Sequence, residues 1–239
     1  MIHIGGHSDS VAAGPGINDN GSGTISILET AIQLTKFTVK NAVRFSWWTA
    51  EEEGLLGATY YVQQLSQKEK DKIRLFLDFD MMASPNYAFQ IYDGDGSAFN
   101  STGPAGSAEA EHEFTHYFKD IAKVNHTEIE FDGRSDYGPF LEAGIASGGI
   151  AGGAEGLKTE AEVLLFGGAS GVQYDVNYHE DGDTVNNLNY ECWIEMTRAI
   201  AHVTATYALS FDSLGQGNRQ KVKRGTTAHR QTKAYQRWV

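Results

Sequence analysis

Apolar residues along the chain gather in short runs that alternate with segments of helical spacing. Residues 1–6 read as a short buried strand, and residues 41–48 and 73–82 are rich in β-forming side chains. Between these strands, residues 24–35 and 55–65 carry apolar side chains with the period of a helix. The first third of the chain therefore predicts strands and helices in alternation.

The second part of the chain continues this alternation. A strand is predicted at 87–92, and helices at 109–124 and 190–210. The last helix has an apolar face at Trp193, Met196, Ile200 and Val203. In the first part of the chain, the helix at 24–35 is predicted in the same way, from the helical spacing of Ile25, Leu28, Ile32 and Leu34. Alternation of this kind predicts an α/β fold with a largely parallel sheet flanked by helices.

Composition divides the chain into a body and a tail. At 239 residues and 41% hydrophobic, the chain can bury one sizeable core, which we assign to residues 1–213. Residues 214–239 contain seven Lys or Arg and no Asp or Glu, and they lack a periodic apolar face. We therefore expect a basic, disordered tail. No apolar run is long enough to predict a membrane span.

Net charge and cysteine content narrow the function classes. The net charge of −12, which becomes −19 when the seven charges of the tail are removed, argues against a nucleic-acid surface. Cys192 is the single cysteine, so no intramolecular disulfide can form. Glycosylation sequons begin at Asn20, Asn100 and Asn125, whereas the first ten residues do not resemble a signal peptide.

Acids and a histidine follow three successive predicted strands. Parallel strands end at one edge of a sheet, where ligands of α/β proteins bind. The residues in question are His7 and Asp9 after the first strand, Asp19 in the loop beyond it, Glu51 and Glu52 after the second, and Asp80 at the end of the third. Imidazole and carboxylate groups together are a ligand set that suits zinc.

Each of these residues also has an ordinary structural use. A histidine after a strand can be a loop residue, glutamates at a helix start stabilise the helix dipole, and Asp19 between two asparagines can form a turn. Independent structural uses do not explain why such residues follow three strands in a row. The combination therefore favours a metal site.

Five collinear motifs resemble the di-zinc aminopeptidase family, which includes bacterial leucine aminopeptidases and fungal aminopeptidase Y. They are GGHSDSVAAGPGINDNGSG, RFSWWTAEEEGLLGATYYV, LDFDMMASPN, GRSDYGPF and YDVNYHEDGDT. The resemblance implies a three-layer αβα fold with a mixed, mostly parallel central sheet. It also implies two zinc ions per chain and removal of N-terminal residues, large and apolar as in leucine, from peptides or proteins.

The resemblance assigns roles residue by residue. His7 and Asp80 bind zinc, Asp19 bridges the two ions, and Glu52 and His179 complete the ligands. Glu51 is the general base, whereas Glu53 is a solvated neighbour.

The family also implies roles for residues around the metal ligands. Asp9 orients His7, Tyr178 donates a hydroxyl to the substrate carbonyl, and Arg134 with Gly133 contacts the substrate. Tyr137 stands where the family usually has histidine, so the resemblance gives it no role.

Family members usually have a helix and two strands before the first zinc histidine, and they are secreted or vacuolar. We therefore expect an N-terminally incomplete catalytic domain with an exposed sheet edge. The sequence leaves the oligomeric state open. Two alternatives remain: a glutaminyl cyclase-like enzyme with a single zinc, and a non-catalytic binding module on the same fold.

Overall fold

The computed structural model describes residues 1–214, and its centre is a six-stranded sheet in the order β2-β1-β3-β6-β4-β5. Strand β6 is antiparallel to β4, and the other neighbouring strands are parallel. The predicted mixed, mostly parallel sheet is therefore confirmed. The strands are β1 (Ile2–His7), β2 (Val43–Trp48), β3 (Leu75–Asp80), β4 (Gln90–Tyr92), β5 (Thr127–Ile129) and β6 (Ser147–Ala151).

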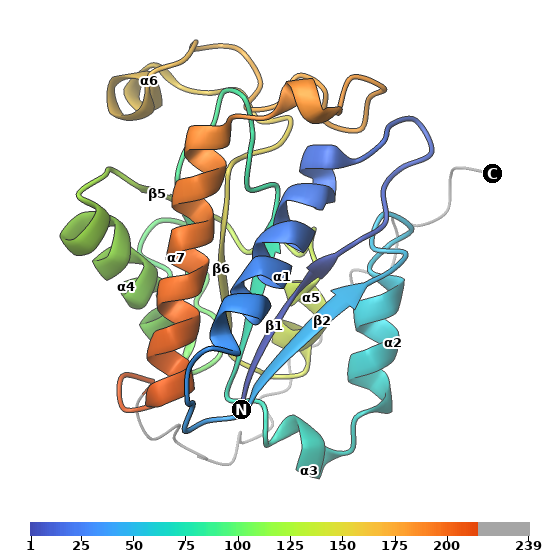
Figure 1. The fold of residues 1–239 in the computed structure, drawn as a ribbon, viewed down its shortest axis with the longest axis vertical. Helices are drawn as coiled ribbons and strands as arrows, with labels where there is room; N and C mark the ends of the chain where they lie inside the picture. Colours follow the sequence, from blue (N-terminus) through green and yellow to red (C-terminus); the bar gives the residue numbers. More distant parts are fainter. Residues whose placement is uncertain (215–239) are drawn as a thin grey trace.

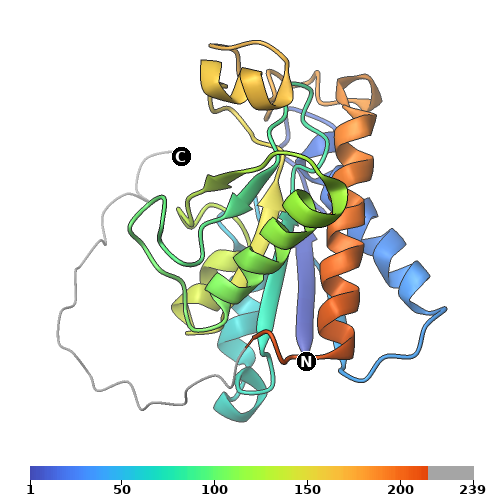
Figure 2. The ribbon, with the colours of Figure 1, turned by 90° about the vertical axis from the view of Figure 1, so that its left-hand side faces the viewer.

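Helices cover both faces of the sheet (Figures 1 and 2). Helices α1 (Gly23–Leu34), α4 (Ser107–His116) and α7 (Tyr190–Leu209) pack on one face, and α2 (Leu56–Gln64) and α5 (Tyr137–Glu142) on the other. The remaining helical segments are α3 (Gln67–Lys70), α6 (Glu160–Phe166), η1 (Ile17–Ser22), η2 (Tyr117–Ala122) and η3 (Val185–Asn187).

Side-chain alternation along β3 separates the two cores. Leu75, Leu77 and Phe79 point into the larger core, which contains the buried faces of α1, α4 and α7. Phe76 points into the smaller core and stacks on Phe140 of α5, with 3.8 Å between ring centroids. Burial on both faces explains why the successive residues Leu75, Phe76 and Leu77 are all apolar.

Helix α1 lies where the sequence predicts it, but three of the four apolar residues that marked its predicted face do not face the core. Ile25, Leu28 and Ile32 are between 41% and 50% exposed. The buried face carries Ile27 together with Gly23, Ser26 and Thr30, and Ser26 Oγ lies 2.8 Å from Thr197 Oγ1 of α7. Close contact between two helices selects small residues, so hydrophobic spacing alone marks the wrong face here.

Several elements carry no strong sequence pattern. Strand β6 has the sequence SGGIA, and a Cβ added at Gly148 would lie 2.7 Å from the Cβ of Ala110, so this glycine lets α4 approach the sheet. Strand β5 has only three residues. The loop between β1 and α1 contains the short helical turn η1.

The predicted tail lies almost wholly outside the described residues. Leu214, its first residue, is buried against the larger core. None of the helices within residues 1–214 has the length and apolar character needed to cross a bilayer.

His3 is a buried polar residue in the smaller core. Its ring centroid lies between 5.3 and 5.5 Å from those of Trp48, Tyr61, Phe76 and Phe140. Its Nε2 lies 2.7 Å from Ser46 Oγ. Burial, with a smaller contribution from the charge of Arg44, lowers the pKa of His3 to about 3. The ring is therefore neutral in the folded protein at neutral pH.

This buried histidine makes stability sensitive to acid. The unfolded chain takes up a proton on His3 below the ordinary histidine pKa of 6.5, whereas the folded chain does so only near 3. Stability is therefore lost as pH falls through that interval. We expect the unfolding free energy of the wild type to fall by about 2 kcal/mol more than that of His3→Phe between pH 7 and pH 5, measured by urea denaturation. Equal losses would contradict this account.

Candidate metal centre

The strand order brings three polar segments to one edge of the sheet. In the parallel register, His7 at the end of β1 pairs with Trp48 at the end of β2. Asp80 ends β3, which lies on the other side of β1. His7, Asp80 and the turn that carries Glu51 therefore meet at the carboxyl edge, as expected from the sequence.

Asp19 lies between two groups of possible metal ligands. One group is His7, Asp19 and Asp80, and the other is Asp19, Glu52 and His179. Asp19 Oδ1 lies 3.2 Å from His7 Nε2, and Asp19 Oδ2 lies 3.1 Å from His179 Nε2. Each carboxylate oxygen of Asp19 thus faces a different imidazole.

Both groups have the dimensions of a zinc site. His7 Nε2 is 3.3 Å from Asp80 Oδ1, and His179 Nε2 is 2.9 Å from Glu52 Oε2. Ligands about 2.0–2.2 Å from a tetrahedral zinc ion stand roughly 3.3–3.6 Å apart, so small adjustments would admit an ion. Glu52 Oε1 is buried without a hydrogen-bond partner among the described residues. These observations fit a divalent cation in each group.

Protein groups alone leave the centre with excess negative charge. Burial, then the charge of Asp80, raises the pKa of Glu51 to about 9. Burial, then the charge of Asp19, raises the pKa of Glu52 to about 7. Burial also disfavours charge on Asp19, but hydrogen bonds with His179 and His7 hold its pKa below the usual value. Bound cations reverse this repulsion and favour ionised carboxylates.

Asp19 is held by residues that the sequence did not identify. Asp183 accepts hydrogen bonds from the backbone N–H groups of Asn18 at 2.8 Å and Asp19 at 3.0 Å. The Asn18 side chain donates to Asp175 Oδ2 at 2.7 Å. The segment around Asp19 is therefore anchored to the distant loop that carries His179. The run HEDGDT contains Asp183, but its acids cannot be distinguished by spacing.

Asn20 anchors the same segment to strand β3. Its Nδ2 donates to the carbonyl of Phe79 at 2.9 Å, and its Oδ1 accepts from the N–H of Gly23 at 2.9 Å. The side chain is 1% exposed. A glycan on Asn20 is therefore incompatible with this fold, which corrects the interpretation of the first sequon.

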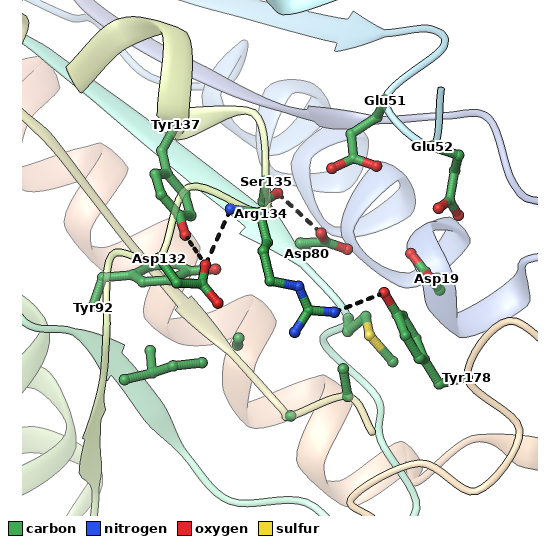
Figure 3. Close-up of a pocket in the computed structure, with 15 residues that line it drawn as sticks. Asp19, Glu51, Glu52, Asp80, Tyr92, Asp132, Arg134, Ser135, Tyr137 and Tyr178 are labelled. Carbon is green, nitrogen blue, oxygen red and sulfur yellow. Dashed lines mark hydrogen bonds between the residues drawn. The ribbon is translucent and has the colours of Figure 1, made fainter. Parts of the chain in front are cut away.

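Asp9 connects His7 with the two glutamates. Its Oδ1 and Oδ2 accept the backbone N–H groups of Glu51 at 3.2 Å and Glu52 at 3.3 Å. Asp9 Oδ1 also lies 3.7 Å from His7 Nδ1. The structure therefore places Asp9 where it can orient both segments. Glu51 belongs to neither ligand group, and its carboxylate points into the pocket beside them (Figure 3).

Tyr178 and Arg134 meet across the pocket (Figure 3). Arg134 donates from its guanidinium to the hydroxyl oxygen of Tyr178 at 3.3 Å, and it forms an ion pair with Glu155 at 2.8 Å. Burial and the charge of Asp19 raise the pKa of Tyr178, so its hydroxyl keeps its proton at neutral pH. Because Arg134 occupies a lone pair of that oxygen, the proton stays available for donation to a ligand.

The pocket beside the two groups of possible metal ligands has a polar and an apolar part. Asp19, Glu51, Glu52 and Asp80 line the polar part. The apolar lining includes Met81, Tyr92, Ile129 and Ala151. Gly133 was predicted to contact substrate together with Arg134, but within residues 1–214 it does not line the pocket. Its N–H instead donates to Tyr137 Oη at 3.0 Å.

Residues behind Asp80 were also missed by sequence reasoning. Ser135 Oγ donates to Asp80 Oδ2 at 3.0 Å, and Asp78 Oδ2 accepts the N–H of Tyr137 at 3.2 Å. The alternation in the run LDFD places Asp78 on the same face as Asp80, which is the available sequence signal. Both contacts attach the loop before α5 to the end of β3.

Comparisons with known proteins agree with this geometry. Residues 1–204 match the model of Peptidase family M28. The chain is 57% identical over 222 residues to a protein named probable leucine aminopeptidase 2 from Aspergillus fumigatus, and the match covers 93% of this chain and 44% of the relative. The chain therefore spans less than half the length of that relative.

Solved structures show the same fold. A zinc aminopeptidase from Bacillus subtilis superposes with a TM-score of 0.69 at 26% identity, over 86% of this chain and 46% of that chain. A glutaminyl cyclase from an Acidobacteriales bacterium superposes with a TM-score of 0.59 at 17% identity, over 85% of this chain and 68% of that one, and shares the fold alone. The family match and the identity to its relatives show that this chain belongs to peptidase family M28.

Proposed function

We propose that the chain is the catalytic part of a zinc aminopeptidase that holds two zinc ions. The observation that carries this proposal is the position of Asp19, whose two oxygens face His7 and His179 at 3.2 and 3.1 Å. A carboxylate shared in this way suits two cations held close together. A single-zinc site, as in the cyclase-like alternative, would need only one of the two groups.

His7 and Asp80 would hold one ion, Glu52 and His179 the other, and Asp19 both. Zinc ions in these groups would supply Lewis-acid polarisation of the scissile carbonyl and would make the attacking water more acidic. Asp9 would fix the orientation of His7 as a ligand.

Glu51 is proposed as the general base. Its carboxylate would accept a proton from the attacking water and return it to the departing amine, so that the products are a free amino acid and a shortened peptide. Its position beside the ligand groups, yet outside both, supports this role.

Tyr178 is proposed as the donor to the negatively charged oxygen that forms on the scissile carbonyl. A hydroxyl that keeps its proton and accepts from a guanidinium is a strong donor in a partly buried site. Arg134 would hold Tyr178 in place and contact the peptide beyond the scissile bond.

The pocket supports preference for a large apolar N-terminal residue. Met81, Tyr92, Ile129 and Ala151 provide an apolar wall next to the carboxylates. A protonated α-amino group would find its counter-charge among these acids. We also propose a secreted or vacuolar location, where the exposed sequons at Asn100 and Asn125 could accept glycans.

Replacing the proposed base should separate catalysis from metal binding. We expect Glu51→Gln to lower kcat for leucine p-nitroanilide by about 10²–10⁴-fold while zinc content stays unchanged, because only the proton acceptor is removed. Steady-state kinetics and elemental analysis measure the two effects. A variant with near wild-type kcat would rule out this role.

Blocking the substrate amine tests exopeptidase action. Acetylation of the α-amino group of leucine p-nitroanilide should reduce kcat/KM at least about 100-fold, because the acids then face a neutral amide of larger size. Equal hydrolysis of both substrates would indicate an endopeptidase or a general amidase instead.

The number of zinc ions bound per chain should depend on whether the substituted residue belongs to one ligand group or to both. Wild type should hold two zinc ions per chain, Asp80→Ala one, and Asp19→Ala fewer than one, because Asp19 belongs to both ligand groups. Elemental analysis, after dialysis has removed the unbound zinc, gives these values. One ion in the wild type would favour the cyclase-like alternative, and none would favour the non-catalytic module.

Asp183 should affect zinc without binding it. Since it accepts the N–H groups of Asn18 and Asp19, Asp183→Ala is expected to weaken zinc affinity by about 10–100-fold through misplacement of Asp19. Competition with a chromophoric chelator measures this change. Asp212→Ala, on the exposed segment after α7, is the matched control, and equal affinities in both variants would refute the anchoring role.

A further inference from the structure

The loop before α5 is held in place by a buried tyrosine for which the family resemblance gave no role. We propose that Tyr137 is a positioning residue whose hydroxyl, together with Asp132, fixes the backbone that aims Arg134 at Tyr178. This inference rests on the proposed aminopeptidase function and assigns a further residue to the same site.

Two hydrogen bonds join the Tyr137 hydroxyl to the loop, and a third joins Asp132 to Arg134; Figure 3 draws the bonds of Asp132 to Tyr137 and Arg134. Its hydroxyl donates to Asp132 Oδ1 at 2.7 Å and accepts from the N–H of Gly133 at 3.0 Å. The same Asp132 oxygen accepts the N–H of Arg134 at 3.0 Å. One hydroxyl and one carboxylate oxygen therefore determine the course of three successive residues.

The hydroxyl itself has a fixed position because the rest of Tyr137 is rigid. The residue is 1% exposed, and its ring packs against Tyr92 and Phe131 with centroids 4.7 and 4.9 Å away. Its N–H donates to the buried Asp78. Because packing and this hydrogen bond fix Tyr137 against the sheet, its hydroxyl can hold a loop that is otherwise exposed.

Gly133 shows why the loop needs this support. It has a φ of 85°, a region that glycine occupies readily, and no atom lies within 4 Å of a Cβ added there. Packing therefore does not confine the loop at this point. The hydrogen bond to Tyr137 is the constraint that the structure provides for its N–H.

The orientation of the Arg134 side chain depends on the loop because its guanidinium has two partners. Its guanidinium donates to Tyr178 and also forms an ion pair with Glu155, and its side chain is 55% exposed. If the loop moved freely, Arg134 could keep its ion pair with Glu155 while both side chains shifted toward solvent. An exposed ion pair does not require a fixed backbone. The contact with Tyr178, at 3.3 Å, would then be lost first.

Tyr137→Phe removes the hydroxyl and keeps the ring. In the zinc-loaded chain we expect kcat for leucine p-nitroanilide to fall by about tenfold with KM changed less than about twofold, because the loop acts through Tyr178 on the transition state. Asp132→Ala alters the exposed loop and leaves the core intact. It should likewise lower kcat with little change in KM. Tyr117→Phe is the control, since Tyr117 also donates to a carboxylate, Glu195 at 2.7 Å, on the opposite face of the sheet.

Coupling to Arg134 distinguishes positioning from a general loss of structure. If Tyr137 acts through Arg134, the double variant Tyr137→Phe, Arg134→Ala should be no slower than Arg134→Ala alone. Additive losses in kcat would overturn the proposal, as would a Tyr137→Phe variant with wild-type kcat.

Amide hydrogen exchange gives a readout that does not depend on activity. The N–H groups of Gly133 and Arg134 should exchange at least about tenfold faster in Tyr137→Phe and at the wild-type rate in Tyr117→Phe. Unchanged exchange at both amides would refute the proposal even if the chain proved inactive. An inactive wild type with the expected exchange pattern would instead reject the aminopeptidase function and retain the anchoring of the loop.

Discussion

The central constraint in this structure is the sharing of one carboxylate between two groups of possible metal ligands. Asp19 is 4% exposed, and its oxygens face imidazoles that come from opposite ends of the domain sequence. Such an acid must be held without freedom to rotate. The surrounding fold meets this requirement through buried polar residues that attach the backbone near Asp19 to β3 and to the loop of His179.

The same constraint explains the charge of the pocket. Several acids stand within a partly buried space, and the raised pKa values of Glu51 and Glu52 record their mutual repulsion and burial. A protein that only had to be stable would not gather them there, because burying unpaired acids costs free energy. Bound cations would make this arrangement favourable, and they would favour the ionised form that the proposed general base requires.

Sequence patterns predicted the parts of the structure that follow local rules. Strand ends located His7, Asp80 and the glutamate pair, because parallel strands deliver their carboxyl ends to one edge. The resemblance added His179, which no local pattern connects to the others. The buried face of α1 was not predictable from hydrophobic spacing, because Ser26 contacts α7 and Ile27 enters the larger core while Ile25 and Leu28 stay exposed. Long-range hydrogen bonds, such as those that Asp183 accepts from Asn18 and Asp19 and that Asp78 accepts from Tyr137, leave no periodic signal at all.

Anomalous diffraction at the zinc edge, from crystals grown with zinc, tests the central claim most directly. We expect two anomalous peaks, one on each side of the Asp19 carboxylate: one beside His7 and Asp80 and the other beside Glu52 and His179. A single peak, or two peaks of which only one contacts Asp19, would contradict the shared carboxylate on which the proposed mechanism depends.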